Sequence, residues 1–224
     1  MSASPLRVLR LAARDGAAVR AAPGVLAAAP RFDAAEIVAR ARARDPRAAA
    51  QIWDHYAPTV RGVLYRSVGP DGDVDDLMQE VFVGFFRNVG GLRDPAALKP
   101  FLIGIALRTA RAALRKRRVR RWLRLTPTGE PPEVEATTAD PRTREALRRL
   151  FVVLDELAAR DRLAFVLRHG EGYELTEVAS ALACSLATVK RCLARAEAHV
   201  LARARVDVLL APYAREEGGI HDTP

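Results

Sequence analysis

The segment from Glu174 to Val200 limits the fold most, because it predicts two short helices joined by a tight turn. Apolar residues recur in both halves at spacings of three and four, which is typical of amphipathic helices. Ser185 precedes the second helix and is a residue type that caps helix N-termini. The apolar positions are Leu175, Val178, Ala179 and Leu182 in the first half, and Leu186, Val189, Leu193, Ala196 and Val200 in the second. The pattern predicts a helix-turn-helix.

The outer face of the second helix is basic and rich in hydrogen-bonding groups. Such a face suits the major groove of DNA, so we expect this helix to bind DNA. The alternative is an ordinary helical hairpin with a solvated charged face. The expected DNA-binding residues are Ser185, Thr188, Lys190, Arg191 and Arg195.

The amino-acid composition indicates that the rest of the chain is helical as well. Half of the residues are hydrophobic, many of them alanine, and only 6% are aromatic. No segment alternates in the way that strands do, so we predict an all-α protein. Both cysteines, Cys184 and Cys192, fall in the helix-turn-helix, and no histidine lies near them at ligand spacing. We therefore expect no metal site, no cofactor and a reducing, cytoplasmic location.

Positive charge is concentrated in one segment. The net charge is +9, and residues 99–125 carry ten basic and no acidic side chains. Like charges this dense repel each other along a helix, so an anionic partner explains them better than solvent does. Spacings of three and four place most of these arginines on one stripe, with Arg117 beside it. The candidate nucleic-acid contacts are Arg108, Arg111, Arg115, Arg117 and Arg118.

The composition changes abruptly after this basic segment. Residues 126–141 hold four acidic and no basic side chains together with four prolines, as flexible linkers do. We therefore predict two small helical domains joined by a flexible acidic linker, the second domain ending in the helix-turn-helix. The predicted divisions are a poorly ordered N-terminal extension (1–32), a first domain (33–125), the linker (126–141), a second domain (142–211) and a C-terminal tail (212–224).

Two further expectations concern membranes and targeting. No run of residues approaches the roughly 18 apolar positions that span a bilayer, so we expect no membrane association. The N-terminal extension is rich in arginine and alanine and poor in acids, a composition that an organellar transit peptide shares. We interpret it as a poorly ordered extension, with targeting as the alternative.

The segment Asp73–Val89 has the clearest amphipathic pattern in the chain. Its apolar stripe predicts a helix with one buried face, and acidic residues gather on the opposite face. Acids in the first turns of a helix stabilise its positive N-terminus. The same acidic face is also suited to docking against a basic partner helix. Its polar members are Asp75, Asp76, Gln79 and Glu80.

These features together resemble the extracytoplasmic-function (ECF) group of bacterial RNA polymerase sigma factors. Three stretches carry the resemblance: DDLMQEVF from Asp75, LAARDRLAFVLR from Leu157, and EVA…L…SLATVK…LARA from Glu177. The resemblance covers about residues 47–205. It implies a promoter-specificity subunit in which the acidic helix docks on the clamp helices of the polymerase's largest subunit. It further implies that residues 101–118 open and contact the minus-ten element and that the helix-turn-helix contacts the minus-thirty-five element.

Three positions depart from the family pattern. Arg108 stands where the family has a base-capturing asparagine, Ala112 replaces an aspartate, and Cys192 lies where another arginine is frequent. The arginine at position 108 suggests altered sequence preference or weaker reading of a flipped base, and the cysteine at position 192 leaves base preference at that position open. The resemblance also makes an anti-sigma factor a candidate partner, in addition to core polymerase and promoter DNA.

Two other classes of protein share part of this pattern. A stand-alone helix-turn-helix regulator binds DNA without polymerase and has no need of the acidic face of Asp73–Val89. A nucleic-acid enzyme needs clustered carboxylates for metal ions, or a nucleophile beside a base. The only dense carboxylate set is that of Asp73–Glu80, and the four histidines are scattered. We therefore expect no catalysis and no small-molecule substrate.

Overall fold

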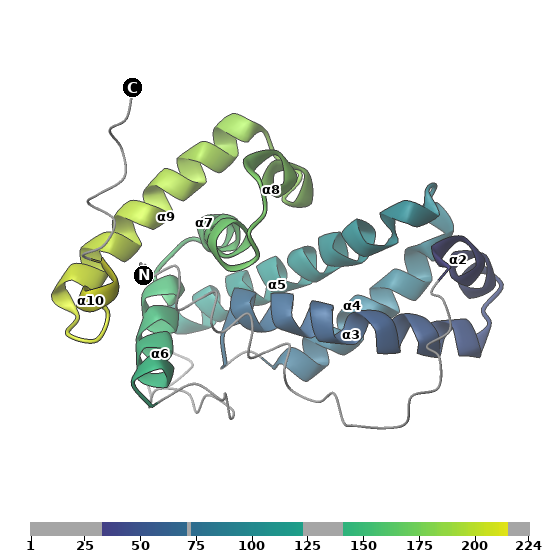
Figure 1. Cartoon of the computed structure of the whole chain (residues 1–224), viewed down its shortest axis with the longest axis horizontal. Coiled ribbons are helices and arrows are strands. Elements are labelled where there is room, and N and C mark those ends of the chain that lie inside the picture. Colours follow the sequence, from purple (N-terminus) through teal and green to yellow (C-terminus); the bar gives the residue numbers. More distant parts are fainter. Residues whose placement is uncertain (1–32, 71–72, 123–140, 215–224) are drawn as a thin grey trace.

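The computed structural model describes residues 33–70, 73–122 and 141–214. All regular structure in these residues is helical, which confirms the predicted all-α class. The molecule is elongated, with α2 at one end and α10 at the other (Figure 1). The predicted N-terminal extension, nearly all of the acidic linker and most of the C-terminal tail lie outside the described residues.

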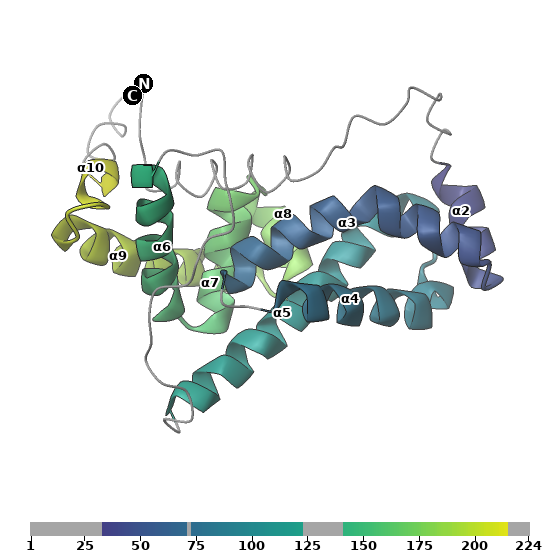
Figure 2. The ribbon, with the colours of Figure 1, turned by 90° about the horizontal axis from the view of Figure 1, so that it is seen from below.

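The first predicted domain consists of four α-helices and two single 3₁₀ turns. Helices α3, α4 and α5 pack on one another, and α2 lies across one end of them (Figures 1 and 2). The elements are α2 (Ala34–Arg42), α3 (Pro46–Val68), α4 (Val74–Asn88), η1 (Val89–Gly91), η2 (Pro95–Ala97) and α5 (Leu98–Trp122).

Aspartate side chains start most of these helices, as their positions in the sequence predict. The side chain of Asp33 accepts hydrogen bonds from the first backbone N–H groups of α2, at 2.8 and 3.2 Å. Asp45 caps α3 in the same way, with Pro46 directly after it. Asp73 caps α4 at 3.3 Å. These bonds satisfy N–H groups that have no partner within the helix.

The second predicted domain contains five α-helices and a π-helical turn. The elements are α6 (Pro141–Asp155), α7 (Ala159–Phe165), η3 (Val166–Gly170), α8 (Leu175–Ala181), α9 (Leu186–Val206) and α10 (Ala211–Ala214). Helix α9 ends at Val206, because Asp207 adopts an extended conformation and its side chain accepts hydrogen bonds from the backbone N–H groups of Leu209 and Leu210. The short helix α10 was not predicted.

The two predicted domains pack directly on each other. Helix α7 lies between α5 and α9, and α8 also contacts α5 (Figure 1). One cluster of buried side chains joins residues of α2–α5 to residues of α7, η3, α8 and α9. A second cluster lies among α6, α7, η3 and α9, with Tyr65 of α3 against it. The core therefore continues across the predicted domain boundary.

Candidate nucleic-acid interface

The helix-turn-helix forms where the sequence predicts it, in helices α8 and α9. Ser185 caps α9, with its hydroxyl accepting a hydrogen bond from the backbone N–H of Thr188 at 3.2 Å. In the turn, Ala183 has a positive φ of 48°, a conformation that only glycine adopts without steric cost. The hydroxyl of Ser185 therefore acts as the N-cap of α9.

Three of the expected DNA-binding side chains lie together at the start of α9. Lys190 and Arg191 are exposed, and Thr188 is half-buried. The guanidinium of Arg191 donates a hydrogen bond to the hydroxyl of Thr188 at 3.4 Å. This end of α9 therefore presents positive charge and hydrogen-bonding groups to solvent on one face.

Arg195 lies one turn further along α9 and already has a partner. It forms two parallel bonds to the carboxylate of Asp161 on α7, at 2.9 and 2.7 Å. Burial alone would raise the pKa of Asp161, but hydrogen bonds from Arg195 and Cys192 outweigh it, so that pKa is lowered. Such a two-point contact fixes the direction of the guanidinium while the Arg195 side chain stays largely exposed.

Cys192 is not part of the exposed face. It is 1% exposed and lies in the core with Val189 and Leu193. Burial is the largest cause that raises the pKa of its thiol, and the hydrogen bond to Asp161 is the next; the pKa rises to about 11. The expectation that a cysteine here alters base preference is therefore corrected, because Cys192 faces helix α7 rather than the groove side. At the position where the family often has an arginine, Cys192 therefore contributes to the packing of the core.

The five expected arginines of α5 are not equally exposed. Arg108, Arg115 and Arg118 are exposed, whereas Arg111 and Arg117 are half-buried. The apolar part of α5 is buried on more than one side, because α3 and α4 pack against it from one direction and α7 and α8 from another. Its buried residues are Leu98, Leu102, Ile103, Ile105, Ala106, Leu107, Ala110 and Leu114.

The acidic face of α4 is open to solvent. Asp75, Asp76, Gln79 and Glu80 are all exposed, and the opposite face of the helix is buried in the core as predicted. Asp75 forms an ion pair with Arg61 of α3. No ion pair joins Asp76 or Glu80 to any side chain in the described ranges.

Sequence reasoning missed the contacts that join the two predicted domains. Arg162 of α7 is 1% exposed and donates from Nε to the carbonyl oxygen of Ser67 at 2.5 Å. It also forms an ion pair with Asp155, and Arg117 of α5 binds the same carboxylate at 2.9 Å. Arg117 in addition donates to the carbonyl of Val68 at 3.2 Å. Two arginines thereby satisfy carbonyl groups that the end of α3 leaves open.

A second ion pair reinforces this contact. Arg66 of α3 bonds to Glu171, which follows η3, and their side chains are 8% and 14% exposed. Nearby, the rings of Tyr65 and Phe151 meet edge to face with centroids 5.8 Å apart. Gly69 has a φ of 81°, and a Cβ there would lie 3.1 Å from Phe151. The end of α3 is thus enclosed by residues of α6, α7 and η3.

The described residues show neither a metal-binding cluster nor a membrane-spanning helix. No three histidine, cysteine or carboxylate side chains in the described ranges lie close enough to hold a metal ion. Among the helices of residues 33–70, 73–122 and 141–214, none is long and apolar enough to cross a membrane.

Two family models match the chain. Sigma-70 region 2 matches residues 52–120 and Sigma-70 region 4 matches residues 142–200, so each predicted domain has its own match. The acidic helix α4 lies inside the first matched range, which also covers most of the basic helix α5, and the second covers α8 and most of α9.

Curated relatives agree with these models. The chain is 31% identical over 128 residues to RNA polymerase sigma factor CarQ of Myxococcus xanthus, covering 57% of this chain and 72% of CarQ. It is 31% identical over 153 residues to the RNA polymerase sigma-E factor of Streptomyces avermitilis, covering 66% and 82%. It is 27% identical over 174 residues to the ECF RNA polymerase sigma-E factor of Escherichia coli K12, covering 71% and 88%.

A solved structure shares the fold. The structure of CnrH in complex with the cytosolic domain of CnrY matches with a TM-score of 0.54 at 24% identity, covering 78% of this chain and 99% of CnrH. The two matched regions and the relatives define a sigma-70-type transcription factor. The chain belongs to the extracytoplasmic-function group of RNA polymerase sigma factors. The alternative of a stand-alone regulator is set aside by this membership.

Proposed function

We propose that this sigma factor binds core RNA polymerase through the acidic face of α4 and promoter DNA through α5 and α9. The observation that carries the proposal is that α4 exposes Asp76, Gln79 and Glu80 while Leu77, Met78, Val81, Phe82 and Phe85 on its other face lie in the core. An acidic face that is not neutralised within the chain suits a basic helical partner. The clamp helices of the largest polymerase subunit, implied by the family, are the proposed partner.

The DNA contacts are divided between the two basic helices. Helix α5 supplies phosphate contacts near the minus-ten element through its arginines, and α9 supplies major-groove contacts at the minus-thirty-five element through Thr188, Lys190 and Arg191. Arg108 and Ala112 are both exposed, so the two departures from the family pattern lie on the outer side of α5, where they can affect sequence preference.

The remaining parts of the proposal follow from family membership. The chain carries no catalytic group of its own, and RNA synthesis belongs to the core enzyme. It acts in the cytoplasm, where core polymerase lies, and an anti-sigma factor is a proposed further partner. In vitro transcription tests the whole assignment: adding the chain to core polymerase should give promoter-dependent starts. Absence of both core binding and such starts on genomic templates would contradict it.

Replacing Glu80 with arginine should weaken core binding by about tenfold or more, because it reverses a charge at the proposed contact. Glu80 is exposed and has no ion pair among the described residues, so the fold should be unaffected. Affinity for core can be measured by surface plasmon resonance, with Asp54→Arg on α3, another exposed acidic side chain without an ion pair in the described ranges, as the matched control outside the face. Equal affinity of the Glu80 variant and the wild type would argue against docking through α4.

Two neighbouring residues of α9 should differ in their effects on DNA binding. Replacing Arg191 with alanine should cost about 1–3 kcal/mol on the cognate minus-thirty-five sequence and relax specificity, as expected for a base contact. Replacing Lys190 should weaken binding to all sequences alike and lower the salt slope by about one, as expected for a phosphate contact. Titration of cognate and scrambled duplexes with the holoenzyme at several salt concentrations separates the two. Identical losses on both duplexes for Arg191→Ala would refute base reading.

A further inference from the structure

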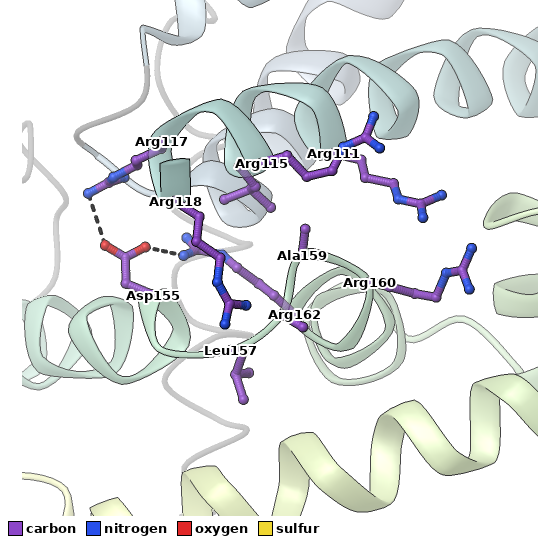
Figure 3. A pocket seen from close by; sticks show the side chains of 11 residues that line it. Arg111, Arg115, Arg117, Arg118, Asp155, Leu157, Ala159, Arg160 and Arg162 are labelled. Carbon is purple, nitrogen blue, oxygen red and sulfur yellow. Dashed lines mark hydrogen bonds and ion pairs between the residues drawn. The ribbon is translucent and has the colours of Figure 1, made fainter. Parts of the chain in front are cut away.

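A pocket of about 280 Å³ lies where α5 meets the start of α7 and the end of α6. Figure 3 shows α5 forming one wall and Leu157, Ala159 and Arg160 forming the other, with Asp155 between Arg117 and Arg162. Six arginines line it and Asp155 is its only acidic residue. The arginines are Arg111, Arg115, Arg117, Arg118, Arg160 and Arg162.

The single carboxylate leaves most of this positive charge unbalanced. Asp155 is shared by Arg117 and Arg162. Within the described ranges no carboxylate forms an ion pair with the other four arginines, which are Arg111, Arg115, Arg118 and Arg160. Asp161, which neighbours Arg160 in the chain, is already bound at both oxygens by Arg195. Four guanidinium groups held around one cavity repel each other unless an anion joins them.

Arg160 lines the pocket and, like Arg144 and Arg148 elsewhere, has a buried donor without an acceptor among the described residues. Its Nε atom is buried and has no hydrogen-bond acceptor in the part of the chain that the structure describes. A buried donor without an acceptor is costly, so such atoms ordinarily have a partner. An acceptor oxygen placed in the pocket would supply one.

The arrangement of the arginines favours a compact ligand over a duplex. Arg111 of α5 and Arg160 of α7 extend from opposite walls toward the same side of the pocket, whereas Arg162 turns toward Asp155 (Figure 3). Duplex DNA presents phosphates on a convex surface and reaches one wall at a time, whereas a small anion can contact both walls. Guanidinium groups bind phosphate oxygens through two parallel hydrogen bonds. Several phosphate groups in one molecule would match the four arginines that lack an ion pair within the described ranges better than a single phosphate.

We propose that this pocket binds a compact anion that carries a chain of two or more phosphate groups, held between Arg111, Arg115 and Arg118 of α5 and Arg160 of α7. The phosphates could belong to an inorganic polyphosphate or to a nucleotide, for whose sugar or base Leu114 and Leu157 offer an apolar wall. Because its two walls belong to different predicted domains, the bound anion holds the domains in the packed arrangement. Arg111, Arg115 and Arg118 are also among the proposed minus-ten contacts, so binding of the anion is measured in the absence of DNA.

Calorimetric titration of the full chain with inorganic tripolyphosphate, at constant ionic strength, tests the proposal. Arg160→Gln should weaken binding at least tenfold, as should Arg111→Gln on the opposite wall. Arg205→Gln, an exposed arginine near the end of α9, is the matched control and should bind as the wild type does. Far-UV circular dichroism and the melting temperature establish that each variant is folded. Equal affinity of the Arg160 variant, the control and the wild type would overturn the site.

Three further titrations identify the ligand and exclude general charge attraction. Tighter binding of a nucleoside triphosphate than of tripolyphosphate supports a nucleotide, and equal binding supports the phosphate chain alone. Orthophosphate that binds as tightly as tripolyphosphate would overturn the proposal, because no phosphate chain is then required. The proposal would also be overturned if Arg160→Gln lost affinity for duplex DNA and for tripolyphosphate by the same factor. The pocket would then be part of the DNA-binding surface.

Discussion

Replacing Arg162 with methionine should lower the free energy of unfolding by about 3 kcal/mol or more, the cost typical of removing one partner from a buried ion pair. Arg162 is 1% exposed and binds both the carboxylate of Asp155 and the carbonyl of Ser67. Methionine keeps much of the volume but donates no hydrogen bond. The carbonyl of Ser67 then loses a donor in a place that water does not reach.

The loss can be measured by urea unfolding followed by circular dichroism, with a replacement elsewhere as reference. Arg149→Met on α6 is the matched control, since Arg149 is exposed and pairs with Glu145 at 3.3 Å on the surface. Surface pairs contribute at most about 1 kcal/mol, so the control should be nearly neutral. A similar small loss for both variants would show that Arg162 does not stabilise the packed arrangement.

The local structure could be predicted because it follows from short-range rules. The apolar periodicity of Asp73–Val89 predicted the buried stripe of α4, and Ser185 was expected to cap α9, as it does. In the apolar half of α5, however, Leu102, Ile103, Ile105, Ala106 and Leu107 are all buried, so more than one side of this helix is covered. Apolar periodicity predicts one buried face for a helix that packs against a single layer, whereas α5 packs against helices on two sides.

The error at Cys192 had a signal in the sequence that would have prevented it. Cys192 lies three residues after Val189 and four before Ala196, on the stripe that was already assigned to the core. The comparison with a family arginine placed it on the DNA side, but helical spacing places it inside, and the structure agrees with the spacing. Periodicity is the stronger evidence at such a position, since it applies to this chain directly.

The contact between the two predicted domains had no comparable signal. Arg66, Arg162 and Glu171 are ordinary charged residues in the sequence, and nothing in their spacing pairs residues about 100 positions apart. Their pairing depends on how α3 and α7 meet in three dimensions. The pocket arginine Arg160 was likewise quoted only as part of a family motif. These residues were therefore missed, although the arginines of α5 that face them were identified.

Reversing the charge of Arg66 should separate the two packed segments. Arg66→Glu places a second carboxylate beside Glu171, where both side chains are at most 14% exposed. Breaking a buried pair in this way typically costs about 3–5 kcal/mol, which is much of the stability of a small domain. Glu171→Arg should have a similar effect, because it leaves two guanidinium groups together. We expect a larger radius of gyration by small-angle X-ray scattering in either variant.

The exchanged pair distinguishes electrostatic pairing from general damage to packing. The double variant Arg66→Glu/Glu171→Arg restores opposite charges at the same place and should recover at least about 2 kcal/mol of the loss, a coupling within the range found for contacting residues. Its scattering profile should return toward that of the wild type. The geometry permits only partial recovery, since the guanidinium of Arg66 lies within 2.9 Å of where a Cβ at Gly62 would be, and a carboxylate does not fill that space. Additive losses in the double variant would mean that the ion pair does not hold α3 against the second segment.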